Sequence, residues 1–122
     1  MRKPASAYAK GIMGEDRACE YLQAKGMVLL KRRYRSLYGE IDLIMQDENT
    51  LVFVEVKTRE RGHGGDGFLA ITAAKQKRIL QTAALYLAEC GEEKAVRFDA
   101  MEITQEGIIY MPYAFDASNV RW

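Results

Sequence analysis

Hydrophobic residues near the start of the chain recur with the spacing of an α-helix. Between Ser6 and Lys25, a rotation of about 100° per residue gathers one apolar face, and Gly26 follows directly as a helix-ending residue. That face comprises Tyr8, Gly11, Ile12, Ala18, Cys19 and Leu22. Glu15 lies at its centre, where a carboxylate is costly unless it is paired, hydrogen-bonded or bound to a metal. We therefore expect Glu15 to have a polar partner on a neighbouring element.

Three segments rich in branched and aromatic residues follow this helix. They predict β-strands at Met27–Arg35, Tyr38–Gln46 and Leu51–Thr58. The polar residues 47–50 form a turn, so the last two strands should pair as an antiparallel hairpin. If Gln46 faces Leu51, the same register brings Asp42 opposite Glu55 and Glu40 opposite Lys57, all on one face of the sheet.

The rest of the chain alternates between a loop, a second helix and two more strands. Residues 59–67 contain four glycines and read as a flexible connector, without the Gly-Lys-Ser/Thr ending of a phosphate-binding loop. Helical periodicity runs from Thr72 to Glu89 and stops near Gly91. Strands are then expected at Lys94–Thr104 and Ile108–Met111, and Pro112 should end the last strand or place it at a sheet edge. The expected order is α-β-β-β-α-β-β in a single domain, residues 1–122.

Composition narrows the classes of protein to which the chain can belong. Its 122 residues are 48% hydrophobic and 29% charged, which is typical of one globular domain. The longest run without a charged residue is ten residues, Ile79–Ala88, too short to span a membrane, so we expect a cytoplasmic protein without membrane association. Cys19, Cys90 and His63 are too few for a structural zinc site. We expect both cysteines to be small buried hydrophobic residues. Any metal must then be held by oxygen ligands, which favours Mg²⁺ or Mn²⁺.

The predicted hairpin register supplies a reason for such a metal. Two carboxylates about 5 Å apart, at an effective dielectric of about 20, repel each other by roughly 3 kcal/mol. A divalent cation between Asp42 and Glu55, with the backbone carbonyl of Val56 as a further ligand, turns this repulsion into attraction. A register error of one residue, or a proton on one carboxylate, is the alternative. Lys57 could stabilise charge on a bound phosphate or simply pair with Glu40.

Charges are unevenly distributed along the chain. Residues 1–35 contain nine Lys or Arg and three Asp or Glu, a balance of +6, whereas residues 36–73 contain three and seven, a balance of −4. This distribution is what a polyanion-binding surface beside an acidic pocket requires. Candidate phosphate contacts on the predicted strand and second helix are Lys31, Arg32, Arg33, Arg35, Lys75, Lys77 and Arg78. The alternative is that these side chains only keep the protein soluble.

Residues 39–44 (GEIDLI) and 53–59 (FVEVKTR) resemble the PD-(D/E)xK nuclease superfamily. Within it, the chain is similar to the bacterial YraN-like family, which is largely uncharacterised and related to archaeal Holliday junction resolvases; the similarity extends from residue 14 to residue 115. Ile41 stands where the superfamily name has proline. The resemblance implies a restriction-endonuclease-like mixed β-sheet flanked by helices.

The same resemblance implies roles for individual residues. Asp42 and Glu55 would be metal ligands, Lys57 the catalytic lysine, and Glu15 the first-helix glutamate of resolvase-like members. Arg59 and Gln76 lie in segments that carry the resemblance and join Arg33, Arg35 and Lys75 as candidate nucleic-acid contacts.

Two functions are consistent with these residues. The first is a Mg²⁺- or Mn²⁺-dependent endonuclease that hydrolyses phosphodiester bonds in DNA, with branched or irregular DNA as the expected substrate. The second is a nucleic-acid-binding or assembly module that keeps the fold without turnover. The complete set Glu15, Asp42, Glu55 and Lys57 favours the first, since a decayed site would be expected to lose at least one of its members. A choice between DNA and RNA, and between a monomer and a homodimer, is left open.

Overall fold

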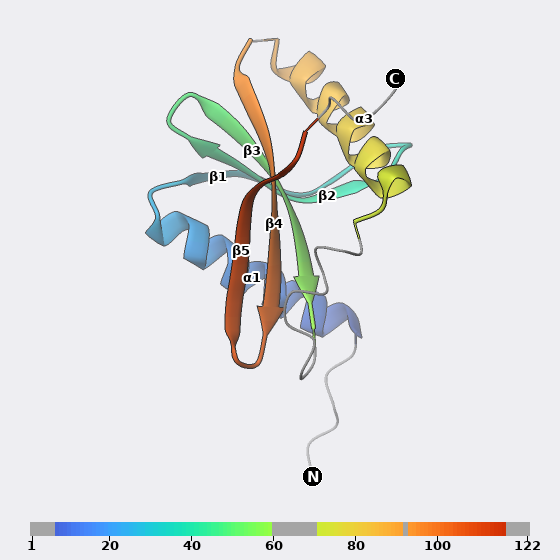
Figure 1. Ribbon diagram of the computed structural model, residues 1–122. Helices are drawn as coiled ribbons and strands as arrows, with labels where there is room; N and C mark the ends of the chain where they lie inside the picture. Colours follow the sequence, from blue (N-terminus) through green and yellow to red (C-terminus); the bar gives the residue numbers. More distant parts are fainter. Residues whose placement is uncertain (1–6, 60–70, 92, 117–122) are drawn as a thin grey trace.

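The computed structural model describes residues 7–59, 71–91 and 93–116. It is a mixed α/β structure in which one five-stranded sheet is flanked by two helices (Figure 1). The elements are α1 (Ala7–Ala24), β1 (Val28–Arg35), β2 (Glu40–Asp47), β3 (Thr50–Thr58), α3 (Ala73–Cys90), β4 (Ala95–Thr104) and β5 (Gly107–Phe115). The predicted order α-β-β-β-α-β-β and the expected mixed sheet are confirmed. Most of the predicted glycine-rich connector, with His63, lies outside the described residues.

The sheet has the order β1-β2-β3-β4-β5. β1, β2 and β3 are antiparallel neighbours, and β4 lies parallel to β3 because the chain crosses over through α3 between them. In the hairpin of β2 and β3, Gln46 pairs with Leu51 and Ile44 with Phe53. The register predicted from the turn length is therefore confirmed over the paired residues, which end at Leu43 and Val54.

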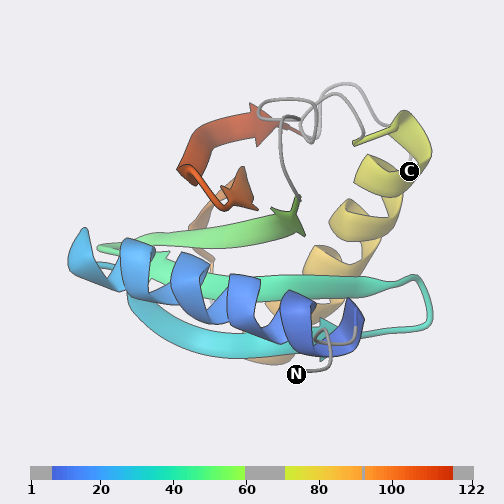
Figure 2. The ribbon, with the colours of Figure 1, turned by 90° about the horizontal axis from the view of Figure 1, so that it is seen from below.

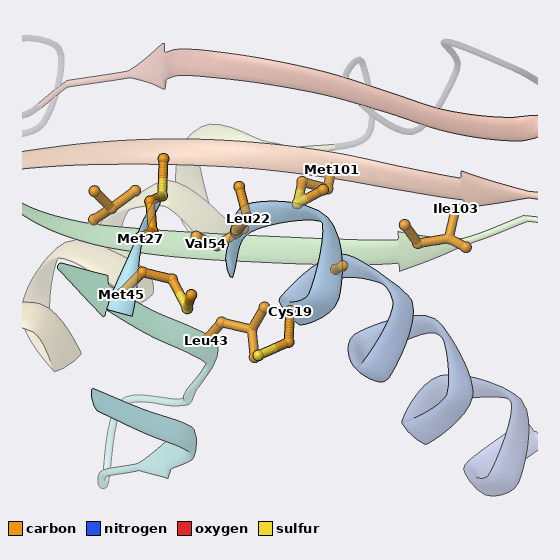
Figure 3. Packing of buried hydrophobic residues seen from close by; sticks show 10 residues of the cluster. Cys19, Leu22, Met27, Leu43, Met45, Val54, Met101 and Ile103 are labelled. Atoms are coloured by element: carbon orange, nitrogen blue, oxygen red, sulfur yellow. The ribbon is translucent and has the colours of Figure 1, made fainter. Parts of the chain in front are cut away.

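The two helices cover opposite faces of the sheet, and strand alternation explains which residues meet each helix (Figure 2). Cys19 and Leu22 of α1 pack in one cluster with Leu43, Met45 and Val54 (Figure 3). The cluster on the other face joins residues of α3 to the intervening strand positions, namely Ile79, Leu80, Ala83, Ile44, Leu51, Phe53 and Phe98. The sheet is thus buried on both sides.

Local signals set the ends of both helices. Gly26, with φ +96°, follows α1, and Gly91, with φ +67°, is the C-cap of α3, so both adopt left-handed conformations that suit glycine. Thr72 is the N-cap of α3, and its Oγ1 accepts a hydrogen bond from the Lys75 N–H at 3.1 Å. These ends agree closely with the predicted helix boundaries.

β5 continues through Pro112 to Phe115, beyond the predicted end of the strand. Of the two outcomes expected for Pro112, the sheet-edge position is the one observed, because β5 is the last strand in the order of the described sheet and pairs with β4. Its register shifts between Phe98 and Ala100, and the Tyr113 N–H donates to Asp99 Oδ1 at 3.0 Å. The irregularity thus lets the strand accommodate a residue that cannot donate a backbone hydrogen bond.

One expectation about the cysteines is wrong. Cys19 is 6% exposed in the α1 cluster, as predicted, but Cys90 is exposed at the last residue of α3, where the helix has passed the edge of the core. Neither of the two helices that the structure describes is long and apolar enough to cross a membrane.

Candidate functional site

A pocket of about 270 Å³ lies where β2 begins, β3 ends and α3 begins. It is lined by Gly39, Glu40, Asp42, Glu55, Lys75, Arg78 and Ile79, and we call it the acidic pocket. The turn before β2 is attached to α3 by a 2.8 Å hydrogen bond between Ser36 Oγ and the buried Thr82 Oγ1. The β2–β3 hairpin and the more distant helix α3 therefore converge at the residues that the hairpin register predicts to be neighbours.

Asp42 is held against β3 by its side chain. Its Oδ2 accepts a hydrogen bond from the Val56 backbone N–H at 2.7 Å, immediately beyond the last backbone pair of the hairpin, Leu43 with Val54. The amide of Val56 makes this contact, and its carbonyl as a metal ligand stays a prediction. This hydrogen bond directs the carboxyl group of Asp42 toward the end of β3, where Glu55 lies.

The environment of Asp42 disfavours its charged form. Burial and the nearby Glu55 carboxylate raise the pKa of Asp42 to about 8, against the opposing effect of the Val56 hydrogen bond. Glu15 and a hydrogen bond with Glu55 add smaller increases. Asp42 therefore retains its proton to a higher pH than an ordinary aspartate does, and the Glu55 carboxylate is one cause.

Two lysines approach the same oxygen of Glu55, which is 8% exposed. Lys75 Nζ lies 2.8 Å and Lys57 Nζ 3.6 Å from Glu55 Oε1. Burial and the hydrogen bond to Lys75 lower the pKa of Lys57. For Lys75, burial is the largest single influence and acts in the same direction, but the hydrogen bonds to Glu55 and Lys57 and the charges of Glu55 and Asp42 together raise the pKa. Lys57 is thus the lysine more readily deprotonated.

Glu40 lies near Arg35, although Lys57 is the residue opposite Glu40 in the predicted hairpin register. Its Oε2 lies 3.7 Å from Arg35 Nε on β1, so Lys57 approaches Glu55 and Arg35 approaches Glu40. Arg35, a candidate nucleic-acid contact, is largely exposed and lies beside a residue that lines the acidic pocket. Lys57 therefore lies near Glu55 on its own strand, while Glu40 lies near Arg35.

Glu15 is buried, and its polar partner is Arg33 on β1. The guanidinium binds both carboxylate oxygens, with Nε 3.0 Å from Oε1 and Nη2 2.7 Å from Oε2. Arg33 has φ +51° and sits between the pairs Arg32–Leu43 and Tyr34–Ile41, at the position of β1 that corresponds to Asp42. The departure from strand geometry lets Arg33 reach α1. Because Glu15 also raises the pKa of Asp42, it acts on the pocket electrostatically while it is paired with Arg33.

The donor atoms of the acidic pocket suit a hard divalent cation. Within residues 7–59, 71–91 and 93–116, no three His, Cys, Asp or Glu side chains form a ready ligand set. The candidate ligands in the pocket are the carboxylates of Asp42 and Glu55, since Glu40, which also lines it, lies near Arg35. Mg²⁺ commonly binds through one or two carboxylates and keeps several waters or substrate phosphate oxygens as its other ligands. The closely spaced carboxylates, one of which has a strongly raised pKa, fit this coordination.

The remaining candidate nucleic-acid contacts are dispersed. Arg32 pairs with Asp16 at 2.7 Å, so Arg32 and Arg33 are both directed to α1. The Gln76 amide donates to the Ile71 carbonyl at 3.1 Å and helps to begin α3. Arg59 lies after β3, next to a second pocket on the α1 side of the sheet. The predicted basic strand is therefore largely neutralised by acidic residues.

The sequence places Lys75 and Arg78 beside the acidic pocket and Glu40 on the sheet face of Asp42 and Glu55, and all three line the pocket. The direct contact between Lys75 and the metal-ligand candidate Glu55 was not predicted. The sequence carries only a weak signal for this contact, since Lys75 borders the inner face of the second helix, one turn before Ile79. Only the crossover between β3 and β4 brings the first turn of α3 over the end of β3.

Comparison with known proteins identifies relatives along nearly the whole chain. A family model described as "Uncharacterised protein family UPF0102" matches residues 14–103. A UPF0102 protein from Nitrosococcus oceani is 43% identical over 122 residues, covering 98% of this chain and 92% of the relative. Another, from Nitrosomonas europaea, is 42% identical over 117 residues, covering 93% and 99%. One from Symbiobacterium thermophilum is 49% identical over 94 residues, covering 76% and 80%. None of these three names states an activity.

Proposed function

This chain belongs to the uncharacterised protein family UPF0102, and we propose that it is a metal-dependent endonuclease of the PD-(D/E)xK type. The proposed reaction is the hydrolysis of phosphodiester bonds in DNA, with branched or irregular DNA as the substrate. The observation that carries the proposal is the grouping of Asp42, Glu55 and Lys75 in one pocket at the end of a hairpin, with Lys57 Nζ 3.6 Å from Glu55 Oε1. Paired carboxylates with adjacent ammonium groups are what metal-assisted phosphoryl chemistry requires.

The proposed roles follow from the contacts in the pocket. A Mg²⁺ or Mn²⁺ ion, bound by Asp42 and Glu55, would supply a Lewis acid that polarises the phosphodiester and activates a water molecule. The Val56 N–H orients Asp42, and the Arg33–Glu15 pair keeps negative charge beside it without exposing Glu15 to solvent. Lys57 donates hydrogen bonds to the negative charge that develops on the phosphate oxygens. Lys75 balances the charge of Glu55 and holds the start of α3 against the pocket.

Cleavage assays with structured DNA test this proposal. The protein is incubated with linear duplex, single-stranded and four-way-junction DNA in Mn²⁺, beside a chelator control and an Asp42→Asn variant. Asparagine keeps an acceptor for the Val56 N–H but removes the anionic ligand, so the variant should fold and lose cleavage. We expect the junction to be cut by the parent protein alone, and only with the metal.

Two outcomes would contradict the proposal. Equal cleavage by the parent and Asp42→Asn proteins would indicate a contaminating nuclease or a misplaced site. Tight junction binding in Ca²⁺ with no cleavage in Mn²⁺ or Mg²⁺ would instead support the alternative, a binding or assembly module that retains the fold. The same series with RNA substrates distinguishes the two nucleic acids.

A further inference from the structure

A second pocket lies at the end of the same strand, on the side of the sheet that faces α1. It has a volume of about 250 Å³ and is lined by residues that include Met13, Gly14, Arg17, Thr58, Arg59 and Thr104; we call it the arginine pocket. Thr58 ends β3 and Thr104 ends β4, which are parallel neighbours. The carboxyl ends of parallel strands are a common location for ligand sites in α/β folds.

The charges around the arginine pocket are unbalanced. Its described lining includes two guanidinium groups, Arg17 and Arg59, and no carboxylate. Arg17 Nη1 donates to the Thr104 carbonyl at 3.1 Å, a neutral acceptor. Among the residues that the structure describes, neither arginine has an ion-pair partner, whereas Arg32, Arg33 and Arg97 all pair with carboxylates. Two positive charges therefore face one cavity without a carboxylate from the described residues beside them.

Arg59 also carries a polar atom that lacks a partner. Its Nε is fully buried and makes no hydrogen bond to any of the described residues. A buried donor on a charged group that stays unsatisfied is costly, and a turn of the Arg59 side chain toward an anionic acceptor in the pocket would remove that cost. This atom indicates a missing ligand more directly than the charge balance does.

The position of Arg59 is set by the backbone around it. Its N–H donates to the Ile103 carbonyl at 2.8 Å, which fixes the residue to the end of β4. Gly14 lets α1 approach β3 closely, because a Cβ added there would overlap Thr58 Oγ1. Binding therefore requires little rearrangement of these elements.

We propose that the arginine pocket binds a phosphate group. Guanidinium groups bind phosphate oxygens through paired, charge-assisted hydrogen bonds, and two of them matched to one anion suit the charge of a phosphate. The inference rests on the proposed function only for the source of that phosphate. If the protein is a nuclease, the phosphate would belong to a nucleotide of the bound strand, away from the cleavage position. The acidic pocket and the arginine pocket flank the end of β3, so one strand could contact both.

Nuclear magnetic resonance of the 122-residue chain tests the inference directly. The Arg59 Nε–H signal and the backbone amides of Gly14 and Thr104 are followed while inorganic phosphate, or separately a short thymidine oligonucleotide in Ca²⁺, is added. We expect saturable shifts at these signals with both probes, and tighter binding of the oligonucleotide. Shifts with inorganic phosphate alone would still support the pocket but assign it to a free phosphate. No shift with either probe would overturn the inference.

Matched variants identify the group responsible. Arg59→Gln should weaken binding of inorganic phosphate roughly tenfold or more, whereas Arg35→Gln removes the same charge from β1 and should leave it unchanged. Arg59→Lys keeps the charge without Nε and should give an intermediate affinity. Equal binding by Arg59→Gln and the parent would contradict the assignment. The Asp42→Asn protein should bind phosphate like the parent. Loss of cleavage and loss of phosphate binding in the arginine pocket can therefore be distinguished.

Discussion

Asp42 is the residue in which the chemistry of the acidic pocket and the stability of the fold conflict most directly. Burial and Glu55 disfavour its ionised form, while the Val56 N–H at 2.7 Å favours it. A group whose pKa is higher in the folded protein than in the unfolded chain binds more protons when folded over the pH range between the two values. Its favourable contribution to folding is therefore greatest at low pH and is lost as pH rises.

We predict that the free energy of unfolding of the metal-free protein falls as pH rises from about 4 to about 8, the range between the usual pKa of a carboxyl group and the value near 8 for Asp42. Urea unfolding in a chelator, at a series of pH values, measures this change. Asp42→Asn cannot ionise and should flatten the profile. Mn²⁺ should restore stability at pH 8 to the parent and not to the variant. Parallel pH profiles for the two proteins would show that another group titrates.

The two lysines on Glu55 should differ in their effects. Lys75, at 2.8 Å, competes with a cation for this carboxylate, so we predict that Lys75→Met tightens Mn²⁺ binding roughly tenfold in calorimetry. Lys57→Ala should keep metal binding and lower turnover by roughly 100- to 1,000-fold, because its ammonium group acts on the reacting phosphate. Near-parental cleavage by Lys57→Ala would limit Lys57 to a structural role. Weaker metal binding by Lys75→Met would show that Lys75 organises Glu55 instead of competing for it.

At the scale of elements, the approach of α1 to β3 connects the two pockets. Gly14 contacts Thr58 in the arginine pocket, and the next residue, Glu15, pairs with Arg33 beside Asp42. A displacement of α1 would therefore disturb both sites.

Two glycines in the same helix provide a matched test of this packing. A Cβ at Gly14 would overlap Thr58 Oγ1, whereas one at Gly11 would have no atom within 4 Å. We predict that Gly14→Ala destabilises the protein by about 1 to 3 kcal/mol, while Gly11→Ala stabilises it by up to about 1 kcal/mol through helix propensity. Thr58→Ala should recover much of the loss in a double-mutant cycle. Similar effects of the two alanine substitutions would mean that Thr58 moves aside without cost.

At the scale of the whole molecule, only some of the basic residues that the sequence suggests as phosphate contacts have a positive charge available to a polyanion. Arg32 and Arg33 form short ion pairs with α1, and Arg35 lies near Glu40. Arg78 is exposed, lines the acidic pocket and has no acidic partner among the described residues. Binding of a duplex should therefore depend on Arg78 more directly than on Arg33.

We predict a corresponding difference in salt dependence. Each phosphate contact contributes about −0.9 to the slope of log affinity against log salt concentration, so Arg78→Gln should reduce the slope by about that amount in Ca²⁺. Arg33→Gln should leave the slope unchanged and lower the free energy of unfolding, because it leaves the buried Glu15 without its partner. Fluorescence anisotropy across a salt series measures the slopes. A larger change in slope for Arg33→Gln than for Arg78→Gln would reverse the assignment.

Much of the fold was predictable because it depends on local chemistry. The helix ends follow from Gly26, Thr72 and Gly91, and the hairpin register follows from a short turn between alternating strands. That register is why the sequence alone identifies Asp42 and Glu55 as partners. The extent of β5 was less predictable, since the strand passes Pro112 only because pairing with β4 and the hydrogen bond to Asp99 support it.

The sequence by itself determined the order of the elements, the pairing of β2 with β3 and the isolation of Glu15 on an apolar helix face, because each depends on residues close together in the chain. Only the tertiary structure decided that Arg33 binds Glu15, that Lys75 reaches Glu55, that Cys90 is exposed and that Arg59 faces a pocket. These outcomes depend on how α1 and α3 cross the sheet. Side-chain contacts between elements far apart in sequence leave no periodic pattern from which they could be predicted.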